Sequence, residues 1–185
     1  MTMCVSGQII NGYEYVDLGL NVKWATCNVG ASSPEDYGSY YAWGETSMKR
    51  SYTYYNSETF GKEIDDISGT YRDVARVKWG SPWRMPTKIE FQELLSTCIW
   101  TWTTRNGVNG FNVTSKRNGE SIFLPAAGYR WATSLYCAGS GGMCWSSKPD
   151  KVNNLNAELI IFGRVDHDTY SLYRYYGFTV RPVSE

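Results

Sequence analysis

The stretch that decides the fold lies at the end of the chain and reads Tyr175-Tyr-Gly-Phe-Thr-Val-Arg-Pro-Val183. Its aromatic and β-branched residues predict a rigid strand, and Gly142-Gly-Met-Cys-Trp-Ser-Ser147 predicts a second one. Between them, in residues 148–173, charged, amide, aromatic and aliphatic side chains follow one another without a catalytic spacing. A fixed frame that carries a chemically mixed surface is typical of a binding protein, whereas an enzyme needs a few groups in set positions.

The composition is that of a folded domain and argues against nucleic-acid binding. With 185 residues and 42% hydrophobic content, the chain is long enough to bury a core, and we expect a single domain over 1–185. Eighteen basic and eighteen acidic residues cancel, so no positive field favours a nucleic acid, and no stretch suits a membrane span. Eight Trp and fifteen Tyr exceed the needs of one core, which predicts that some form a recognition surface.

The N-terminus and the cysteines give little information on the compartment. Residues 1–11 are expected to form an arm, and they lack the basic start and apolar run of a secretion signal. The five cysteines, at positions 4, 27, 98, 137 and 144, include no Cys-x-x-Cys pair, so buried free thiols are the expected state. A disulfide between Cys27 and Cys98 stays open for an exported protein.

Two helices are predicted. Thr87-Lys-Ile-Glu90 is a capping box, in which the hydroxyl and the carboxylate satisfy backbone N–H groups of the first turn. Apolar residues follow with helical spacing at positions 91, 94, 95 and 98. A shorter helix is expected over residues 73–79, and the polar span 44–71 is expected to be a long surface excursion.

Most of the remaining chain reads as short strands joined by turns. Strands are predicted at residues 13–20, 22–27, 40–43, 99–102, 110–115, 121–124, 142–145, 157–162 and 178–183. Asn118-Gly119 predicts a type I′ hairpin turn, in which both residues have positive φ. Two helices with mostly short antiparallel strands indicate an α+β fold class.

Seven short motifs are spread over nearly the whole chain. They read Gly12-Tyr-Glu-Tyr-Val-Asp-Leu-Gly-Leu20, Lys23-Trp-Ala-Thr-Cys-Asn-Val-Gly-Ala31, Tyr40-Tyr-Ala-Trp-Gly-Glu45, Trp83-Arg-Met-Pro-Thr87, Phe123-Leu-Pro-Ala-Ala-Gly-Tyr129, Cys144-Trp-Ser-Ser147 and Gly177-Phe-Thr-Val-Arg-Pro-Val183. In these motifs the chain resembles the Fibrobacter succinogenes major paralogous domain family of Bacteroides and their phages. The resemblance implies a C-type lectin fold in its formylglycine-generating-enzyme-like branch, with segments 13–20 and 178–183 at the two ends paired as strands.

The resemblance also implies a function. Some members of the family are variable proteins of diversity-generating retroelements, in which template adenines are randomised in the C-terminal part of the gene. Randomising an asparagine codon in this way yields Asn, Tyr, Asp, His, Cys, Gly, Arg, Val, Ile, Leu, Phe, Ser, Thr, Ala or Pro, and never Lys, Glu, Gln, Met or Trp. Residues 160–173 contain only permitted types, and Cys137, Gly141 and Cys144 also fit. Other positions of the region do not: Trp131, Met143, Lys148, Lys151 and Glu158. The variable binding region is therefore expected at about 130–173.

Catalytic and metal-binding interpretations find less support. Asp166-His-Asp168 offers metal-ligand chemistry, but neighbours in sequence rarely converge on one ion and no second His exists, so solvated or ligand-contacting residues are expected. The acidic residues in 63–66 are expected to be solvated, because the calcium motifs of sugar-binding lectins are missing. A hydrolase would have to use His167, yet no Gly-x-Ser-x-Gly elbow presents a nucleophile. Cys137 and Cys144 leave a formylglycine-generating-type oxidase as an alternative, although the surrounding motif differs.

We therefore expect a non-enzymatic ligand-binding domain without cofactor or metal. Its partner is expected to be a protein or glycan ligand on a cell surface. The domain itself is expected to be extracellular, on a cell surface or on a virion, and an adhesin or structural subunit is a further alternative. The predicted ligand contacts combine aromatic area with directional polar groups. They are Trp131, Leu135, Cys137, Gly141, Cys144, Asn153, Asn156, Ile161, Arg164, Asp166, His167, Asp168, Tyr170, Leu172 and Tyr173. Structural roles are expected for Trp24, Trp43, Trp79, Trp83, Trp100, Trp102 and Arg181.

Overall fold

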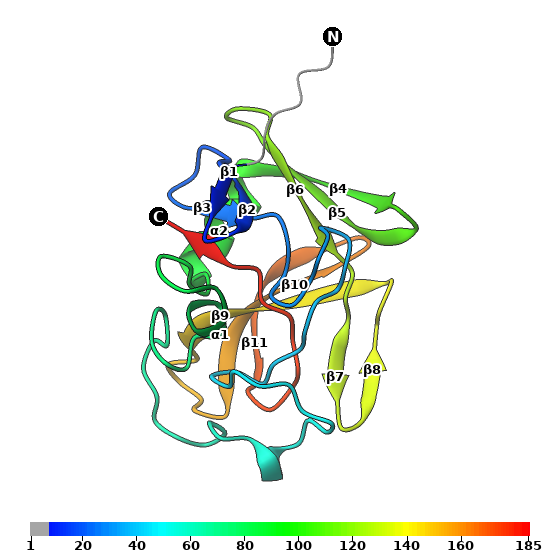
Figure 1. Cartoon of the computed structure of the whole chain (residues 1–185). Helices are drawn as coiled ribbons and strands as arrows, with labels where there is room; N and C mark the ends of the chain where they lie inside the picture. Colours follow the sequence, from blue (N-terminus) through cyan, green and yellow to red (C-terminus); the bar gives the residue numbers. More distant parts are fainter. Residues whose placement is uncertain (1–7) are drawn as a thin grey trace.

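The computed structural model describes residues 8–185 and consists mainly of antiparallel strands with two α-helices (Figure 1). The strands are β1 (Gln8–Ile10), β2 (Tyr13–Val16), β3 (Lys23–Ala25), β4 (Cys98–Arg105), β5 (Val108–Ser115), β6 (Ser121–Pro125), β7 (Tyr129–Trp131), β8 (Ser134–Tyr136), β9 (Gly141–Pro149), β10 (Asn156–Gly163), β11 (His167–Tyr173) and β12 (Val183–Ser184). The helices are α1 (Val74–Trp79) and α2 (Lys88–Thr97), and a 3-10 turn, η1, covers Tyr54–Asn56. Within the arm predicted for residues 1–11, residues 8–10 form β1, which was not predicted; residues 1–7, with Cys4, lie outside the described part.

Both predicted helices are confirmed. At the start of α2, the Thr87 backbone N–H donates to Glu90 Oε2 at 2.7 Å and the Glu90 N–H donates to Thr87 Oγ1 at 3.3 Å, which completes the capping box. The helix buries Phe91 and Leu94 on one face. Asp73 caps α1 by accepting a hydrogen bond from the Arg76 N–H at 3.0 Å.

Antiparallel pairing organises the strands of the described chain into sheets with the orders β1-β2-β3-β12, β11-β10-β9, β4-β5-β6 and β7-β8. The last strand joins the N-terminal sheet, because Val183 lies opposite Trp24 and Ser184 opposite Lys23. The two ends of residues 8–185 therefore share one sheet. The C-terminal strand pairs with β3, however, and not with the predicted neighbour at 13–20, of which only residues 13–16 form β2.

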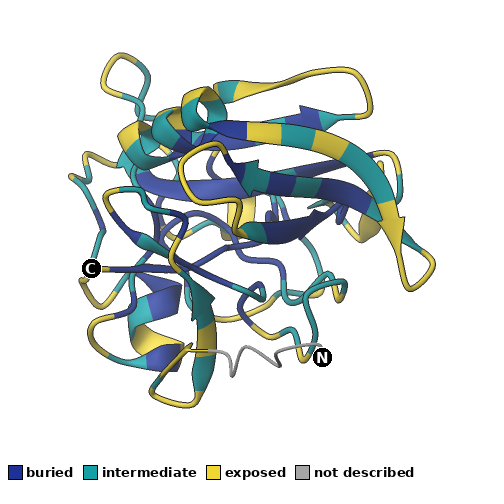
Figure 2. Ribbon diagram, turned by 90° about the horizontal axis from the view of Figure 1, so that it is seen from above, coloured by how far each residue is buried: buried dark blue, intermediate teal, exposed yellow. Residues whose placement is uncertain are grey.

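The sheet β9–β10–β11 lies between two hydrophobic cores. One core contains Trp43, Trp145, Leu159 and Phe178, and the other contains Trp24, Phe91 and Phe162. Figure 2 shows buried positions gathered where strands pack together and exposed positions in the connecting loops. Four of the tryptophans predicted as structural are buried: Trp24, Trp43, Trp79 and Trp83. The other two, Trp100 and Trp102, are partly buried against the second core.

Two predicted strands are mostly irregular. Segment 178–183 forms a ladder only from Val183 onward; upstream of it, Phe178 and Thr179 make single bridges to Tyr41 and Cys144. The predicted strand at 40–43 is likewise reduced to the bridge at Tyr41. The reason is that this C-terminal segment crosses between layers and meets a new partner at each step, and its Pro182 has no N–H to donate to a ladder.

The type I′ turn prediction is wrong. Gly119 has φ of 79°, but Asn118 is not among the residues with positive φ. The hydrogen bond that closes the hairpin runs from the Ser115 N–H to the Glu120 carbonyl at 2.8 Å. The loop between these two residues is therefore longer than two residues. Asn118 instead donates its side-chain amide to the Asp17 carbonyl at 2.9 Å, which ties the loop to the N-terminal sheet.

Candidate ligand-binding surface

The sheet β9–β10–β11 directs alternate side chains to opposite faces. Residues opposite one another in neighbouring strands share a face, so Met143, Ile161 and Asp168 form one row across the sheet. Ile160 and Phe162 point the other way and are buried in the second core. The predicted variable segment 160–173 therefore contains fixed core residues, and the permitted residue types alone do not identify its solvent-facing positions.

β11 itself was not predicted as a strand. It forms the edge of its sheet and pairs with β10 over its whole length, from His167 opposite Phe162 to Tyr173 opposite Asn156. Tyr170 is 58% exposed on it, and Arg164 and Asp166 are exposed in the turn that precedes it. The mixed residues from 164 to 173 thus lie on a hydrogen-bonded strand and the turn before it.

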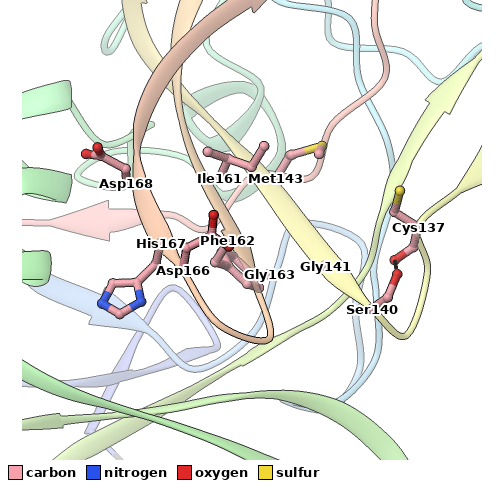
Figure 3. A pocket seen from close by; sticks show the side chains of 10 residues that line it. All are labelled: Cys137, Ser140, Gly141, Met143, Ile161, Phe162, Gly163, Asp166, His167 and Asp168. Atoms are coloured by element: carbon pink, nitrogen blue, oxygen red, sulfur yellow. Dashed lines mark hydrogen bonds between the residues drawn. The ribbon is translucent and has the colours of Figure 1, made fainter.

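A pocket of about 260 Å³ lies where the Met143–Ile161–Asp168 row meets the loop between β8 and β9 (Figure 3). In the close-up, the side chains of Met143 and Ile161 lie beside each other, with Asp168 on one side and Cys137 on the other. The structure brings six predicted contact residues together around this pocket: Cys137, Gly141, Ile161, Asp166, His167 and Asp168. An apolar floor with carboxylates, a thiol and an imidazole nearby suits a ligand with both apolar and polar groups.

His167 is held by aromatic rings of the neighbouring sheet. Its ring stacks on Trp100 with centroids 4.7 Å apart and an interplanar angle of 11°, and it meets the Phe111 ring edge-on at 5.5 Å. Burial lowers the pKa of the His167 imidazole, whereas the negative charges of Asp166 and Asp168 act to raise it. The net direction is downward, which favours a neutral ring at neutral pH.

Aromatic side chains form a continuous band beside the sheet, which we call the aromatic band. Successive rings lie 3.9–6.2 Å apart, at distances typical of stacked and edge-to-face pairs. Its members are Trp131, Tyr136, Tyr129, Tyr176, Tyr175, Tyr173, Phe60, Tyr54 and Tyr55. The exposed fractions of Tyr55, Tyr54 and Trp131 are 83%, 49% and 45%. The band therefore presents a large area of rigid amphipathic rings to solvent.

Most residues of the aromatic band were not predicted from the sequence as ligand contacts. Only Trp131 and Tyr173 were predicted as contacts; the other rings come from three separate segments, 54–60, 129–136 and 175–176. The hairpin β7–β8, which was not predicted, carries Trp131 and also the predicted contact Leu135, 39% exposed. Leu172 lies under the band in a smaller pocket of about 160 Å³, shared with Tyr129, Tyr176 and Met143. Met143 lines both pockets, so the two hollows adjoin.

Two buried arginines fix the frame behind this surface. Arg174 donates to the carbonyls of Asn156, Thr59 and Lys62 at 2.8–3.1 Å, which ties the 44–71 excursion to the sheet. Arg181, fully buried, donates to Asn28 Oδ1 and to three backbone carbonyls at 2.8–3.1 Å, so its predicted structural role is confirmed. Burial lowers the pKa of Arg181 to about 10, which still leaves it charged at neutral pH.

Two predicted contacts do not fit a variable surface. Cys144 is buried in the second core, where its Sγ lies 3.2 Å from Thr179 Oγ1, because the strand period turns it away from Met143. Gly141 is buried as well, and a Cβ there would lie 2.9 Å from the Phe162 carbonyl oxygen. Gly141 borders the pocket through its backbone, but neither position has room for varied side chains.

The remaining predicted contacts lie at the other end of the sheet. Asn153 and Asn156 are near the start of β10, whereas the pocket of Figure 3 lies at its end. With a rise of about 3.3 Å per residue, the two ends of this strand are about 23 Å apart. The predicted residues therefore extend along the whole sheet, and Tyr173, which lies opposite Asn156, connects the two ends.

The cysteines offer no accessible pair among the described residues. Cys27, Cys98, Cys137 and Cys144 are free thiols, so the Cys27–Cys98 disulfide that the sequence left open is not formed. Burial raises the pKa of Cys144, which keeps it protonated, and only Cys137 is exposed. Within residues 8–185, no cluster of three His, Cys, Asp or Glu side chains is arranged to hold a metal ion. No helix in the same range is long and apolar enough to cross a membrane.

Comparison with known proteins adds no relative: the chain matches no family model, no curated protein and no solved structure.

Proposed function

We propose that this chain is a ligand-binding domain of C-type lectin fold, in the formylglycine-generating-enzyme-like branch, whose surface is diversified by a retroelement. The observation that carries the proposal is the separation of roles within one short stretch of chain. Trp145, Phe178 and Arg181 are fully buried, while Arg164, Asp166 and Tyr170 are exposed on or beside a paired strand. Variation at exposed positions of such a frame costs little stability, because surface substitutions usually change it by less than about 0.5 kcal/mol.

The partner is proposed to be a protein exposed on a cell surface. A stable protein interface covers about 800 Å² on each side, and Tyr and Trp provide such area at low cost in side-chain entropy. The aromatic band gives a long row of these residues, and the pocket of Figure 3 adds carboxylates and an imidazole beside it. The band would contribute general affinity, and the residues of β11 and its preceding turn would select the partner.

The DNA around the gene tests this proposal without knowledge of the ligand. We expect a near-copy of the 3′ coding sequence beside a reverse transcriptase gene, differing from it only where the copy has adenine. The differences should fall on codons of exposed residues such as Arg164, Asp166, Asp168 and Tyr170, because exposed side chains can vary without disturbing the core.

Core codons in the same stretch serve as the internal control. Cys144, Ile160 and Phe162 have permitted residue types but are buried, so their codons should be identical in the two copies. Absence of the near-copy would refute diversification, and differences spread equally over exposed and buried codons would refute the division between frame and surface.

A further inference from the structure

A third pocket lies at the opposite end of the central sheet from the pocket of Figure 3. It has a volume of about 480 Å³ and is formed by residues 63–65, residues 149–154 and Arg174. Its size lies within the usual range for small-molecule sites. Its lining shares no residue with the first pocket or with the aromatic band. A ligand there would contact different side chains from those proposed to contact the protein partner.

Arg174 is a fixed cation in the wall of this pocket. The residue is 1% exposed, and its guanidinium lies 4.5 Å from the centre of the Trp43 ring. Its Nε donates to the Asn156 carbonyl at 2.9 Å, and its Nη1 donates to the carbonyls of Lys62 and Thr59 at 2.8 and 3.1 Å. Among residues 8–185, no hydrogen bond engages its Nη2, so this nitrogen remains a donor for a ligand.

The 149–154 segment carries polar side chains that are fixed by hydrogen bonds within the protein and still have hydrogen-bonding atoms without a partner in residues 8–185. Asp150 accepts from the backbone N–H groups of Val152 and Asn153 at 2.8 and 3.1 Å and from the Ser171 hydroxyl at 2.6 Å. Asn153 Oδ1 accepts from the Leu155 N–H at 3.1 Å, which leaves its amide nitrogen available. Asn154 donates to Glu63 Oε1 at 2.8 Å, which leaves its amide oxygen available.

The charges that line the pocket nearly cancel. Three carboxylates, Glu63, Asp65 and Asp150, are opposed by Lys151 and Arg174. A strongly charged ligand therefore gains little from the overall field, and no trio of acidic side chains in the described chain is arranged to hold a cation. Instead, hydrogen-bond donors and acceptors lie close to one another in the lining of the pocket. This pattern suits hydroxyl groups, because each hydroxyl both donates and accepts a hydrogen bond.

We infer that this pocket binds a small neutral polyhydroxylated ligand, a mono- or disaccharide or a related polyol. Arg174 Nη2 and the Asn153 amide donate to ligand hydroxyl oxygens, and the Asn154 amide oxygen and the Asp65 carboxylate accept from ligand hydroxyls. The inference does not depend on retroelement diversification or on the aromatic band.

Titration with defined sugars tests the inference. The probes are D-glucose, D-galactose, D-mannose, N-acetyl-D-glucosamine and myo-inositol, each followed by saturation-transfer NMR and calorimetry; L-glutamate and inorganic phosphate are the charged comparisons. At least one neutral probe should bind with a Kd in the millimolar range or tighter. Asn153→Asp, which keeps the oxygen that accepts from the Leu155 N–H but removes the amide donor, and Asp65→Ala should each weaken that binding at least about fivefold, as expected for the loss of one hydrogen bond.

The matched control is Asn112→Ala, which removes an amide from β5, outside the pocket. It should leave sugar binding unchanged. Arg174 is unsuitable for the test, because its loss would also remove three bonds of the frame. The inference is overturned if no neutral probe binds, if the charged probes bind more tightly, or if both pocket variants bind sugar as well as the Asn112 control does.

Discussion

Arg174, Arg181 and His167 are polar side chains with very different surroundings. The two arginines direct their hydrogen bonds mainly to backbone carbonyls, so they hold loops in place. Within residues 8–185, no hydrogen bond engages the His167 imidazole, and stacking on Trp100 holds the ring. Its ring nitrogens therefore remain available to a ligand, as does the exposed carboxylate of Asp166.

The only histidine of the chain should titrate below its ordinary range. Burial lowers its folded-state pKa, so the unfolded chain binds the proton more readily, and the free energy of unfolding should fall as the pH drops below about 6.5. NMR titration of the imidazole protons should give a midpoint below 6.5. Asp168→Asn should lower the midpoint further, because it removes a charge that raises this pKa, whereas the distant Glu120→Gln should not. A midpoint of 6.5 or above in the wild-type chain would contradict the prediction.

At the scale of elements, the fit between β9 and β10 leaves no room beside Gly142. A Cβ at Gly142 would lie 2.3 Å from Cζ and 2.5 Å from Cε2 of Phe162, whose ring is buried in the second core. We expect Gly142→Ala to lower the free energy of unfolding by about 1–3 kcal/mol, because the ring cannot move without disturbing the core. Urea denaturation measures the change.

Gly163→Ala is the matched control for this substitution. Its nearest neighbour is a carboxylate oxygen of exposed Asp166 at 3.2 Å, so a small shift relieves the contact and the effect should stay below about 1 kcal/mol. Phe162→Leu should recover part of the Gly142→Ala loss in the double variant, since it removes the clashing atoms. Equal effects of the two alanine substitutions would refute the steric explanation.

Elements with strong local signals could be predicted from the sequence, and elements stabilised by their surroundings could not. The capping box at Thr87 predicted α2, because its two hydrogen bonds lie within one turn. β11 carries no apolar alternation, since as an edge strand it exposes residues on both faces. The aromatic band joins rings from segments more than a hundred positions apart, and no local pattern in the sequence reports that Tyr54 lies near Tyr175.

At the scale of the whole molecule, Arg174 connects parts of the chain that are distant in sequence. It joins the end of β11 to Thr59, Lys62 and the Trp43 ring, and the excursion that it holds carries Tyr54 and Tyr55 of the aromatic band. Arg174 therefore helps to fix one end of the band, together with the bridge between Tyr52 and Ala132. The sequence predicted the excursion but not this attachment, because the acceptors are backbone carbonyls.

Arg174→Met should release this excursion. Three carbonyls lose their donor, so we expect a loss of about 2–5 kcal/mol in unfolding free energy and trypsin cleavage after Lys49, Arg50 or Lys62 that is at least about tenfold faster. Mass spectrometry of timed digests locates the cuts. Arg164→Met, in an exposed turn, is the control; it removes one trypsin site but should leave cleavage after Lys49, Arg50 and Lys62 at the wild-type rate. Unchanged cleavage of the Arg174 variant would show that other contacts hold the excursion.

The exposure of Trp131 has an optical consequence. Four tryptophans, Trp24, Trp43, Trp83 and Trp145, are sealed from solvent, whereas Trp131 is 45% exposed at one end of the aromatic band. Iodide in solution should therefore quench the fluorescence of Trp131 first and leave a large protected fraction. A partner that covers the band would shield this residue, and the loss of quenching would report occupancy without any added label.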